Sequence, residues 1–287
     1  MKLATFENNG RHVGAIIGDM ILDVTTAQPY LPTCIEELLR RGLLPEVQNL
    51  VDNAAEIEKP HFRPFKGARL YPPIQNPSKI ICLGINYRGH AAEQHKEPPT
   101  HPILFAKAPS ALTGPYDEII IRPSVEQVDA EAELAVVIGR EGTAVPEAEA
   151  LNYVAGFMAM NDVSARAAQR EDKQWFRAKS FDTFAPCGPW IVTPNEIGDS
   201  LALNVRQRLN DTIMQEGSTS DMIFNVASII AFASSAMTLL PGDIISTGTP
   251  AGVGVYRDPP VFLKDGDVVT VEIERIGFLR NRVKAAR

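Results

Sequence analysis

Three carboxylates in the middle of this 287-residue sequence have the spacing of a metal site. Glu131 and Glu133 alternate with alanine and lead into the apolar run Leu134–Ile138, which is typical of a buried strand. Side chains two residues apart in an extended chain point to one face, so the two glutamates would project together. Asp162 follows a second apolar run, 152–160, and would stand where that strand ends.

Clustered carboxylates repel one another and resist burial unless a positive charge compensates them. Hard divalent cations such as Mg²⁺, Mn²⁺ or Ca²⁺ supply that charge and prefer oxygen ligands. We therefore predict that Glu131, Glu133 and Asp162 bind a divalent metal and leave coordination positions open for water and substrate. Asp129 has the same spacing, but its place at the mouth of the strand predicts solvation. The alternative is a solvent-facing strand end whose acids only keep the edge soluble.

A histidine and a glutamate one helical turn apart form a candidate acid–base pair. They lie in the polar segment 86–95, which separates a buried strand from a proline cluster and is a candidate mobile lid. His90 and Glu93 can hydrogen-bond on one helix face, and such a carboxylate makes the imidazole a base that activates water. A surface helix with an idle histidine is the alternative. His95 and His101 lie nearby, and no local feature favours His90 over them.

Other polar residues could bind a substrate. Lys179 lies beside aromatic residues and could either neutralise a substrate oxyanion or pair with Asp182. Arg166 and Gln169 share a helix face and could hold a carboxylate or cap a neighbouring strand. Thr249, in a glycine-rich run after a strand, offers a hydroxyl and close backbone amides to an anion.

Composition excludes several other classes of function. The net charge of −7 argues against nucleic acid or an anionic membrane as a partner, since either favours a basic face. Three cysteines without metal spacing suit a reducing cytoplasm, and we expect no secretion signal at the N-terminus. The longest apolar stretch, 226–240, is too short to span a bilayer. Nucleotide-binding glycine motifs and the serine elbow of a Ser/His/Asp triad do not occur.

The elements around these residues predict a β-rich α+β fold. Strand-like runs Lys2–Phe6 and His12–Ile17, joined by an Asn-Gly turn, begin a small β-rich N-terminal domain over residues 1–73. Closely spaced prolines mark its end, and residues 74–287 form the larger domain. Strands outnumber helices there without a βαβ rhythm, which favours a mixed β-sandwich roll. Ser164 is expected to cap a helix, and Pro186–Pro189 to form a turn.

From about Lys79 to Val283 the chain resembles the fumarylacetoacetate hydrolase family, in its acylpyruvate hydrolase and 2-hydroxyhepta-2,4-diene-1,7-dioate isomerase branch. The resemblance rests on five motifs in the family's order: LGINYRGH (83–90), EAELAVVIG (131–139), NDVSAR (161–166), KSFDT (179–183) and TGTPAGVG (247–254). It implies a mixed β-sandwich roll, a homodimer, and Mg²⁺ or Mn²⁺ as cofactor. One departure is Ala167, where many members have an acidic residue.

The resemblance also implies roles for the candidate residues. Those roles are metal ligand for Glu131, Glu133 and Asp162, lid dyad for His90 and Glu93, catalytic residue at the oxo-acid end for Lys179, and substrate binding for Gln169, Arg166 and Thr249. The implied reaction is metal-dependent hydrolysis of a C–C bond in an acylpyruvate or related 2,4-diketo acid. The alternative keeps the metal and the enolate chemistry but decarboxylates an oxaloacetate-type acid, or isomerises or hydrates a 2-oxo acid. A non-catalytic scaffold with a structural ion is the rival of another class.

Overall fold

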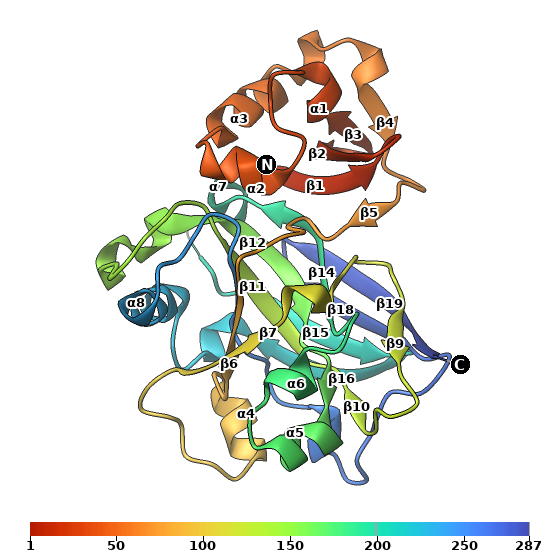
Figure 1. The fold of residues 1–287 in the computed structure, drawn as a ribbon, viewed down its shortest axis with the longest axis vertical. Coiled ribbons are helices and arrows are strands. Elements are labelled where there is room, and N and C mark those ends of the chain that lie inside the picture. Colours follow the sequence, from red (N-terminus) through yellow and green to blue (C-terminus); the bar gives the residue numbers. More distant parts are fainter. Residues whose placement is uncertain (199, 287) are drawn as a thin grey trace.

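The computed structural model describes residues 1–198 and 200–286 and is built mainly from strands (Figure 1). Twelve of them form one sheet: β1 (Lys2–Glu7), β2 (Arg11–Ile17), β3 (Met20–Asp23), β4 (Phe62–Pro64), β5 (Leu70–Tyr71), β6 (Ile80–Gly84), β7 (Ile103–Lys107), β8 (Leu112–Thr113), β11 (Ala132–Ile138), β12 (Val154–Asn161), β14 (Ala185–Val192) and β17 (Ile244–Ser246). Its main path is β4-β3-β2-β1-β14-β12-β11-β17-β6-β7, with β5 beside β1 and β8 beside β14.

A second sheet has five strands in the order β16-β15-β18-β19-β9. These are β9 (Ile119–Ile121), β15 (Asn204–Leu209), β16 (Thr212–Ser218), β18 (Val268–Ile273) and β19 (Gly277–Ala285). The short strands β10 (Val128–Asp129) and β13 (Ser164–Ala165) pair with each other. Mixed sheets with few helices confirm the predicted fold class.

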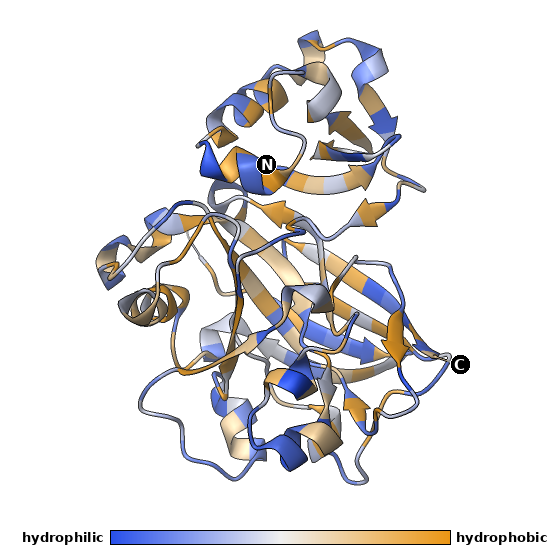
Figure 2. Ribbon diagram, in the orientation of Figure 1, coloured by the Kyte–Doolittle hydropathy of each residue, from blue (hydrophilic) through white to orange (hydrophobic). Residues whose placement is uncertain are grey.

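Strand β11 shows why the acidic stretch runs into an uninterrupted apolar sequence. Leu134, Val136 and Ile138 pack in one hydrophobic cluster, and Ala135 and Val137 in another. Both faces of the strand are therefore covered, so no position alternates to a polar residue. Figure 2 shows apolar residues gathered along the strands of the large sheet.

The N-terminal segment extends the large sheet. Strand β1 pairs with β14, with Lys2 opposite Val192 and Leu3 opposite Ile191. The predicted hairpin of β1 and β2 is confirmed. The segment also carries three helices, α1 (Val24–Ala27), α2 (Ile35–Arg40) and α3 (Leu44–Asp52), which lie over its strands (Figure 1). The domain boundary at residue 73 stays a prediction.

The remaining helices are α4 (Arg88–Glu93), α5 (Arg166–Asp172), α6 (Phe176–Lys179), α7 (Pro194–Ile197) and α8 (Val226–Ala236). Within the described residues, no helix combines the length and apolar character needed to cross a membrane.

Two local predictions were wrong. Ser164 does not cap α5 but pairs with Asp129 in a β-ladder, and α5 begins at Arg166. The sequence 186–189 is not a turn but part of β14, where a cis Gly188–Pro189 bond lies inside the strand.

The side chain of Asn86, at the start of the predicted lid segment 86–95, forms hydrogen bonds to two segments that are distant in the sequence. Its Nδ2 donates to the carbonyls of Thr247 (2.7 Å) and Phe224 (3.1 Å), and its Oδ1 accepts from the Phe224 amide (2.9 Å). Asn86→Ala would leave the buried Thr247 carbonyl and the part-buried Phe224 amide and carbonyl without these partners. We expect it to lower the free energy of unfolding by about 2–3 kcal/mol, measured by urea denaturation. The exposed Asn53→Ala is the control and should change stability by less than about 0.5 kcal/mol. Equal losses would contradict the prediction.

Candidate active site

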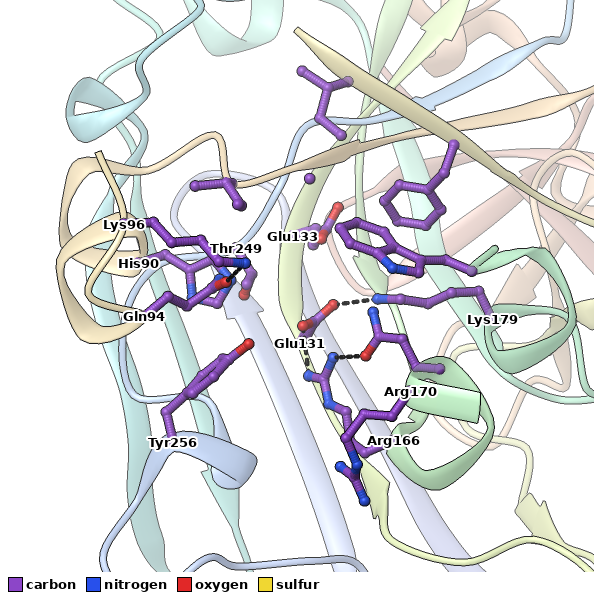
Figure 3. Close-up of a pocket in the computed structure, with 16 residues that line it drawn as sticks. His90, Gln94, Lys96, Glu131, Glu133, Arg166, Arg170, Lys179, Thr249 and Tyr256 are labelled. Atoms are coloured by element: carbon purple, nitrogen blue, oxygen red, sulfur yellow. Dashed lines mark hydrogen bonds and ion pairs between the residues drawn. The ribbon is translucent and has the colours of Figure 1, made fainter. Parts of the chain in front are cut away.

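A cavity of about 210 Å³ opens where the ends of β6, β7 and β11 meet helices α4, α5 and α6 (Figure 3). It is lined by Leu83, Gly84, Ile85, His90, Gln94, Lys96, Phe105, Glu131, Glu133, Arg166, Gln169, Arg170, Trp175, Lys179, Thr249 and Tyr256. Seven of the nine predicted site residues are in this set. The other two, Glu93 and Asp162, lie directly behind it, bonded to His90 and Lys179. The fold therefore brings together predicted site residues that are up to 159 positions apart in the sequence, His90 and Thr249.

The three predicted metal ligands converge. Glu131, Glu133 and Asp162 are buried, and each offers an oxygen within 4.8 Å of the others. Pairing of β11 with β12 explains this, because Ala132 lies opposite Asn161 and the Asp162 amide donates to the Glu131 carbonyl at 2.9 Å. The alternative of a solvent-facing strand end is wrong, since at most 5% of each residue is exposed.

Positive side chains bridge two of these acids. Lys179 Nζ lies 2.6 Å from both Glu131 Oε2 and Asp162 Oδ2, and Arg166 Nη2 lies 2.6 Å from Glu131 Oε1. Burial opposes ionisation of Glu131, but the two cations outweigh it and hold the pKa of its carboxyl well below the ordinary value. Burial likewise disfavours the Lys179 ammonium, yet its carboxylate partners keep the pKa of Lys179 above its usual range. The alternative pairing of Lys179 with Asp182 is wrong.

Glu133 has a different environment. Its Oε2 accepts hydrogen bonds from the Ser246 hydroxyl (2.5 Å) and the Gly248 amide (3.0 Å), and no cation contacts it among the described residues. Burial, followed by repulsion from Asp162 and Glu131, raises the pKa of the Glu133 carboxyl to about 8. The site therefore lacks positive charge at the third acid. Three converging hard oxygen ligands, one of them without a cationic partner among the described residues, fit Mg²⁺ or Mn²⁺.

The raised pKa of Glu133 predicts how the stability of the metal-free protein depends on pH. Its ordinary value is 4.5, so between pH 4.5 and about 8 the folded protein keeps a proton that the unfolded chain releases. Stability from this group is present below that window and is lost as pH rises through it. We expect the melting temperature of EDTA-treated protein to fall across the window by roughly 2–4 °C per kcal/mol lost. Glu133→Gln should remove this component, and an identical profile in that variant would refute it.

The lid dyad is formed and oriented. His90 Nδ1 lies 2.5 Å from Glu93 Oε1, and Glu93 Oε2 accepts from the Gly252 amide at 2.7 Å. Gln94 Nε2 lies 2.7 Å from His90 Nε2. If the amide donates, the ring proton sits on Nδ1 and Nε2 keeps its lone pair, as a general base requires. His95 and His101 are exposed and outside the cavity lining, so of these three histidines only His90 faces the cavity, and its role as the base stays a prediction.

The predicted substrate-binding side chains of Arg166, Gln169 and Thr249 already have protein partners. Arg166 Nε binds Asp129 Oδ2 at 3.1 Å, and its Nη1 donates to Gln169 Oε1 at 2.9 Å. The Thr249 hydroxyl donates to the Ala132 carbonyl at 2.8 Å. The predicted solvation of Asp129 was wrong: it is buried and also accepts from the amides of Gly254 and Val255. The roles of Arg166, Gln169 and Thr249 toward a substrate stay predictions.

Sequence reasoning missed Lys107. Its buried Nζ lies 2.6 Å from Asp162 Oδ1 and donates to the Val163 carbonyl at 3.1 Å. The signal was a lysine as the last residue of an otherwise apolar strand, a position where burial requires an acidic partner. Gln94 and Lys96 were also passed over, because a polar lid sequence does not show which side chains turn inward.

The family model "Fumarylacetoacetate (FAA) hydrolase C-terminal" matches residues 79–284. The chain belongs to the fumarylacetoacetate hydrolase family. It is 43% identical over 275 residues to the rat (Rattus norvegicus) protein "Oxaloacetate tautomerase Fahd2a, mitochondrial", covering 95% of this chain and 87% of that one. The structure of a putative HpcE protein from Mycobacterium smegmatis aligns over the full length of both chains with a TM-score of 0.89 at 33% identity. The structure of maleylpyruvate hydrolase from Sphingobium sp. SYK-6, in complex with manganese(II) and pyruvate, also aligns over the full length of both chains, with a TM-score of 0.81 at 31% sequence identity.

These matches confirm the family, the fold class and that the protein is an enzyme. A divalent cation is supported by the acid cluster here and by the manganese of the Sphingobium enzyme. The choice between Mg²⁺ and Mn²⁺, the homodimer, the cytoplasmic location and the absence of nucleic-acid and membrane partners stay predictions.

Proposed function

We propose that this enzyme interconverts the keto and enol forms of a 2-oxo dicarboxylic acid of the oxaloacetate type. The observation that carries the proposal is one cavity in which an oriented His–Glu pair faces the acid cluster and Lys179. The rat tautomerase, which matches 95% of the chain, supports the predicted alternative more than C–C hydrolysis.

Glu131, Glu133 and Asp162 would hold the divalent cation, which when bound supplies Lewis acidity to a 2-oxo carbonyl. His90 Nε2 takes a proton from C3, the carbon next to that carbonyl. The Glu93 carboxylate accepts a hydrogen bond from Nδ1–H of His90 and stabilises the imidazolium that results. The imidazolium then returns the proton to the oxygen on C2, which gives the enol without consuming water. The reverse sequence gives the keto acid.

Lys179 acts as a fixed positive charge. Its partners Glu131 and Asp162 keep it protonated, so it can stabilise negative charge on a substrate oxygen but cannot serve as a base near neutral pH. Gln94 must leave Nε2 before a substrate reaches the base, because its amide occupies that nitrogen. Movement of α4 or rotation of this side chain would provide access.

Proton NMR in D₂O tests the proposal. Metal-loaded enzyme should accelerate exchange of the C3 protons of oxaloacetate and the approach to keto–enol equilibrium, with no pyruvate formed above the uncatalysed rate. EDTA should abolish the acceleration. Accelerated formation of pyruvate would show decarboxylation instead, and unchanged exchange would refute enolisation of this substrate.

C–C hydrolysis is the second candidate, because a His–Glu pair beside a metal site also suits activation of water. The Sphingobium maleylpyruvate hydrolase shares the fold over the full length of both chains. Incubation with acetylpyruvate would then release acetate and pyruvate in a metal-dependent way. No turnover of oxaloacetate, acetylpyruvate or a hydroxymuconate-type diacid would favour the scaffold with a structural ion.

A further inference from the structure

Lys96 is a cation in the cavity lining that contacts no acid in the part of the chain that the structure describes. Its Nζ donates to Gln94 Oε1 at 3.0 Å, and it makes no ion pair within the described part of the chain. The buried cavity cations Arg166 and Lys179 are, in contrast, held by carboxylates. An exposed ammonium at the mouth of a site is therefore free to bind an anionic group of a ligand.

The backbone at the end of α4 directs Lys96 toward the cavity. His95 has φ 54°, in the left-handed region, and the Lys96 amide donates to the Ala91 carbonyl at 3.0 Å. This is the hydrogen bond of a Schellman turn, which ends a helix and reverses the chain. The chain folds back over the helix that carries His90, and Figure 3 shows Lys96, Gln94 and His90 together on one side of the cavity.

One amide group connects Lys96 to the proposed base. Gln94 Nε2 lies 2.7 Å from His90 Nε2, and Gln94 Oε1 lies 3.0 Å from Lys96 Nζ. In a four-carbon 2-oxo dicarboxylate, the carbon that loses the proton is bonded directly to the second carboxylate. When that carbon meets His90 Nε2, the second carboxylate must lie beside it, in the space that the Gln94 amide now occupies.

We propose that Lys96 binds the second carboxylate of the substrate, which makes the enzyme selective for 2-oxo dicarboxylic over 2-oxo monocarboxylic acids. The proposal rests on the proposed function in that it takes His90 as the base at C3. Once displaced from His90, the Gln94 amide can donate to the same carboxylate. The charge pair thus forms only with a ligand that has this group, and a monocarboxylate leaves Lys96 in solvent.

Arg170 provides a matched control. It is an exposed cation in the same lining, but it comes from α5 and donates to the side chain of Gln127, which is not part of the lining. Figure 3 places it on the side opposite Lys96. Lys96→Met and Arg170→Met each remove one positive charge from the cavity. A difference in ligand affinity between the two variants therefore reports the position of the lost charge and not the change in net charge.

Ligand binding without turnover tests the proposal. L-malate and L-lactate share a 2-hydroxy acid end and differ by the distal carboxylate. Trp175 lines the cavity and Trp190 is the only other tryptophan, so quenching of Trp175 in a Trp190→Phe background reports binding to the Mg²⁺-loaded enzyme. Calorimetry with Trp190 retained gives the same constants should that background fold poorly.

Wild type should bind malate more tightly than lactate. Lys96→Met should weaken malate binding by about 10- to 100-fold and leave lactate binding within about twofold. Lys96→Arg should keep most of the preference, and Arg170→Met should leave it unchanged.

Equal loss for both ligands in Lys96→Met, the same selective loss in Arg170→Met, or a wild type without preference would each overturn the proposal. Because the titrations involve no reaction, selectivity without proton exchange would refute the proposed function alone. Exchange without selectivity would refute the role of Lys96 alone.

Discussion

Glu133→Gln is expected to weaken Mn²⁺ binding by roughly 100-fold or more while the metal-free protein becomes at least as stable as wild type near neutral pH, because the amide does not ionise in the unfolded chain. The reason is that Glu133 alone among the three acids has no cationic partner within residues 1–198 and 200–286, and its pKa is raised to about 8. The metal-free carboxyl is therefore largely neutral, and an amide of the same shape can accept the hydrogen bonds from Ser246 and Gly248. Only the ligand charge toward a cation is lost.

Calorimetric titration with Mn²⁺ and thermal unfolding in EDTA measure the two halves of this prediction. Glu131→Gln is the informative comparison. It removes the carboxylate between Arg166 and Lys179, so it should also destabilise the metal-free protein, by about 3–5 kcal/mol. Retention of tight Mn²⁺ binding by Glu133→Gln would remove the basis for the metal site.

His90→Ala is expected to lower kcat for keto–enol interconversion by about 10²- to 10⁴-fold, the usual contribution of a general base, with little change in KM or in bound metal. The imidazole contacts Glu93 and Gln94 but none of the three predicted metal ligands by hydrogen bond. Its loss therefore removes proton transfer and leaves the acid cluster intact. NMR exchange rates and elemental analysis of the purified variant measure both quantities.

His101→Ala is the matched control, because His101 is an exposed histidine beyond the same lid and outside the cavity lining. It should retain wild-type kcat. Comparable activity of His90→Ala and wild type would show that another group transfers the proton. The role of the dyad would then be structural, as a hydrogen-bonded connection between α4 and the Gly252 amide.

The charge balance of the site suits an anionic substrate. Four buried acids, Asp129, Glu131, Glu133 and Asp162, face three buried cations, Lys107, Arg166 and Lys179. With all acids ionised, one negative charge remains, and a divalent cation would change the sign of the site. A dicarboxylate ligand would then enter a region of positive charge, to which Lys96 at the mouth contributes.

Local periodicity was enough to predict the strands that carry the acids. The alternation at Glu131 and Glu133, followed by an apolar run, depends only on the two-residue repeat of an extended chain and on burial of both faces of β11. The run before Asp162 likewise predicted β12. The order of the motifs identified the family, because this order can be read from the sequence without knowledge of the tertiary contacts.

Only the tertiary structure decided which charges meet. Lys107 and Asp162 are 55 residues apart and Glu133 and Ser246 are 113 apart, so no local pattern could pair them. Burial of Asp129 follows from amides in the Gly254 loop, and the inward turn of Lys96 from a left-handed residue after α4. The sequence by itself thus determined the kind of chemistry, through residue type and spacing. Long-range packing determined the partners, since electrostatic and hydrogen-bonding energies depend on distances in space.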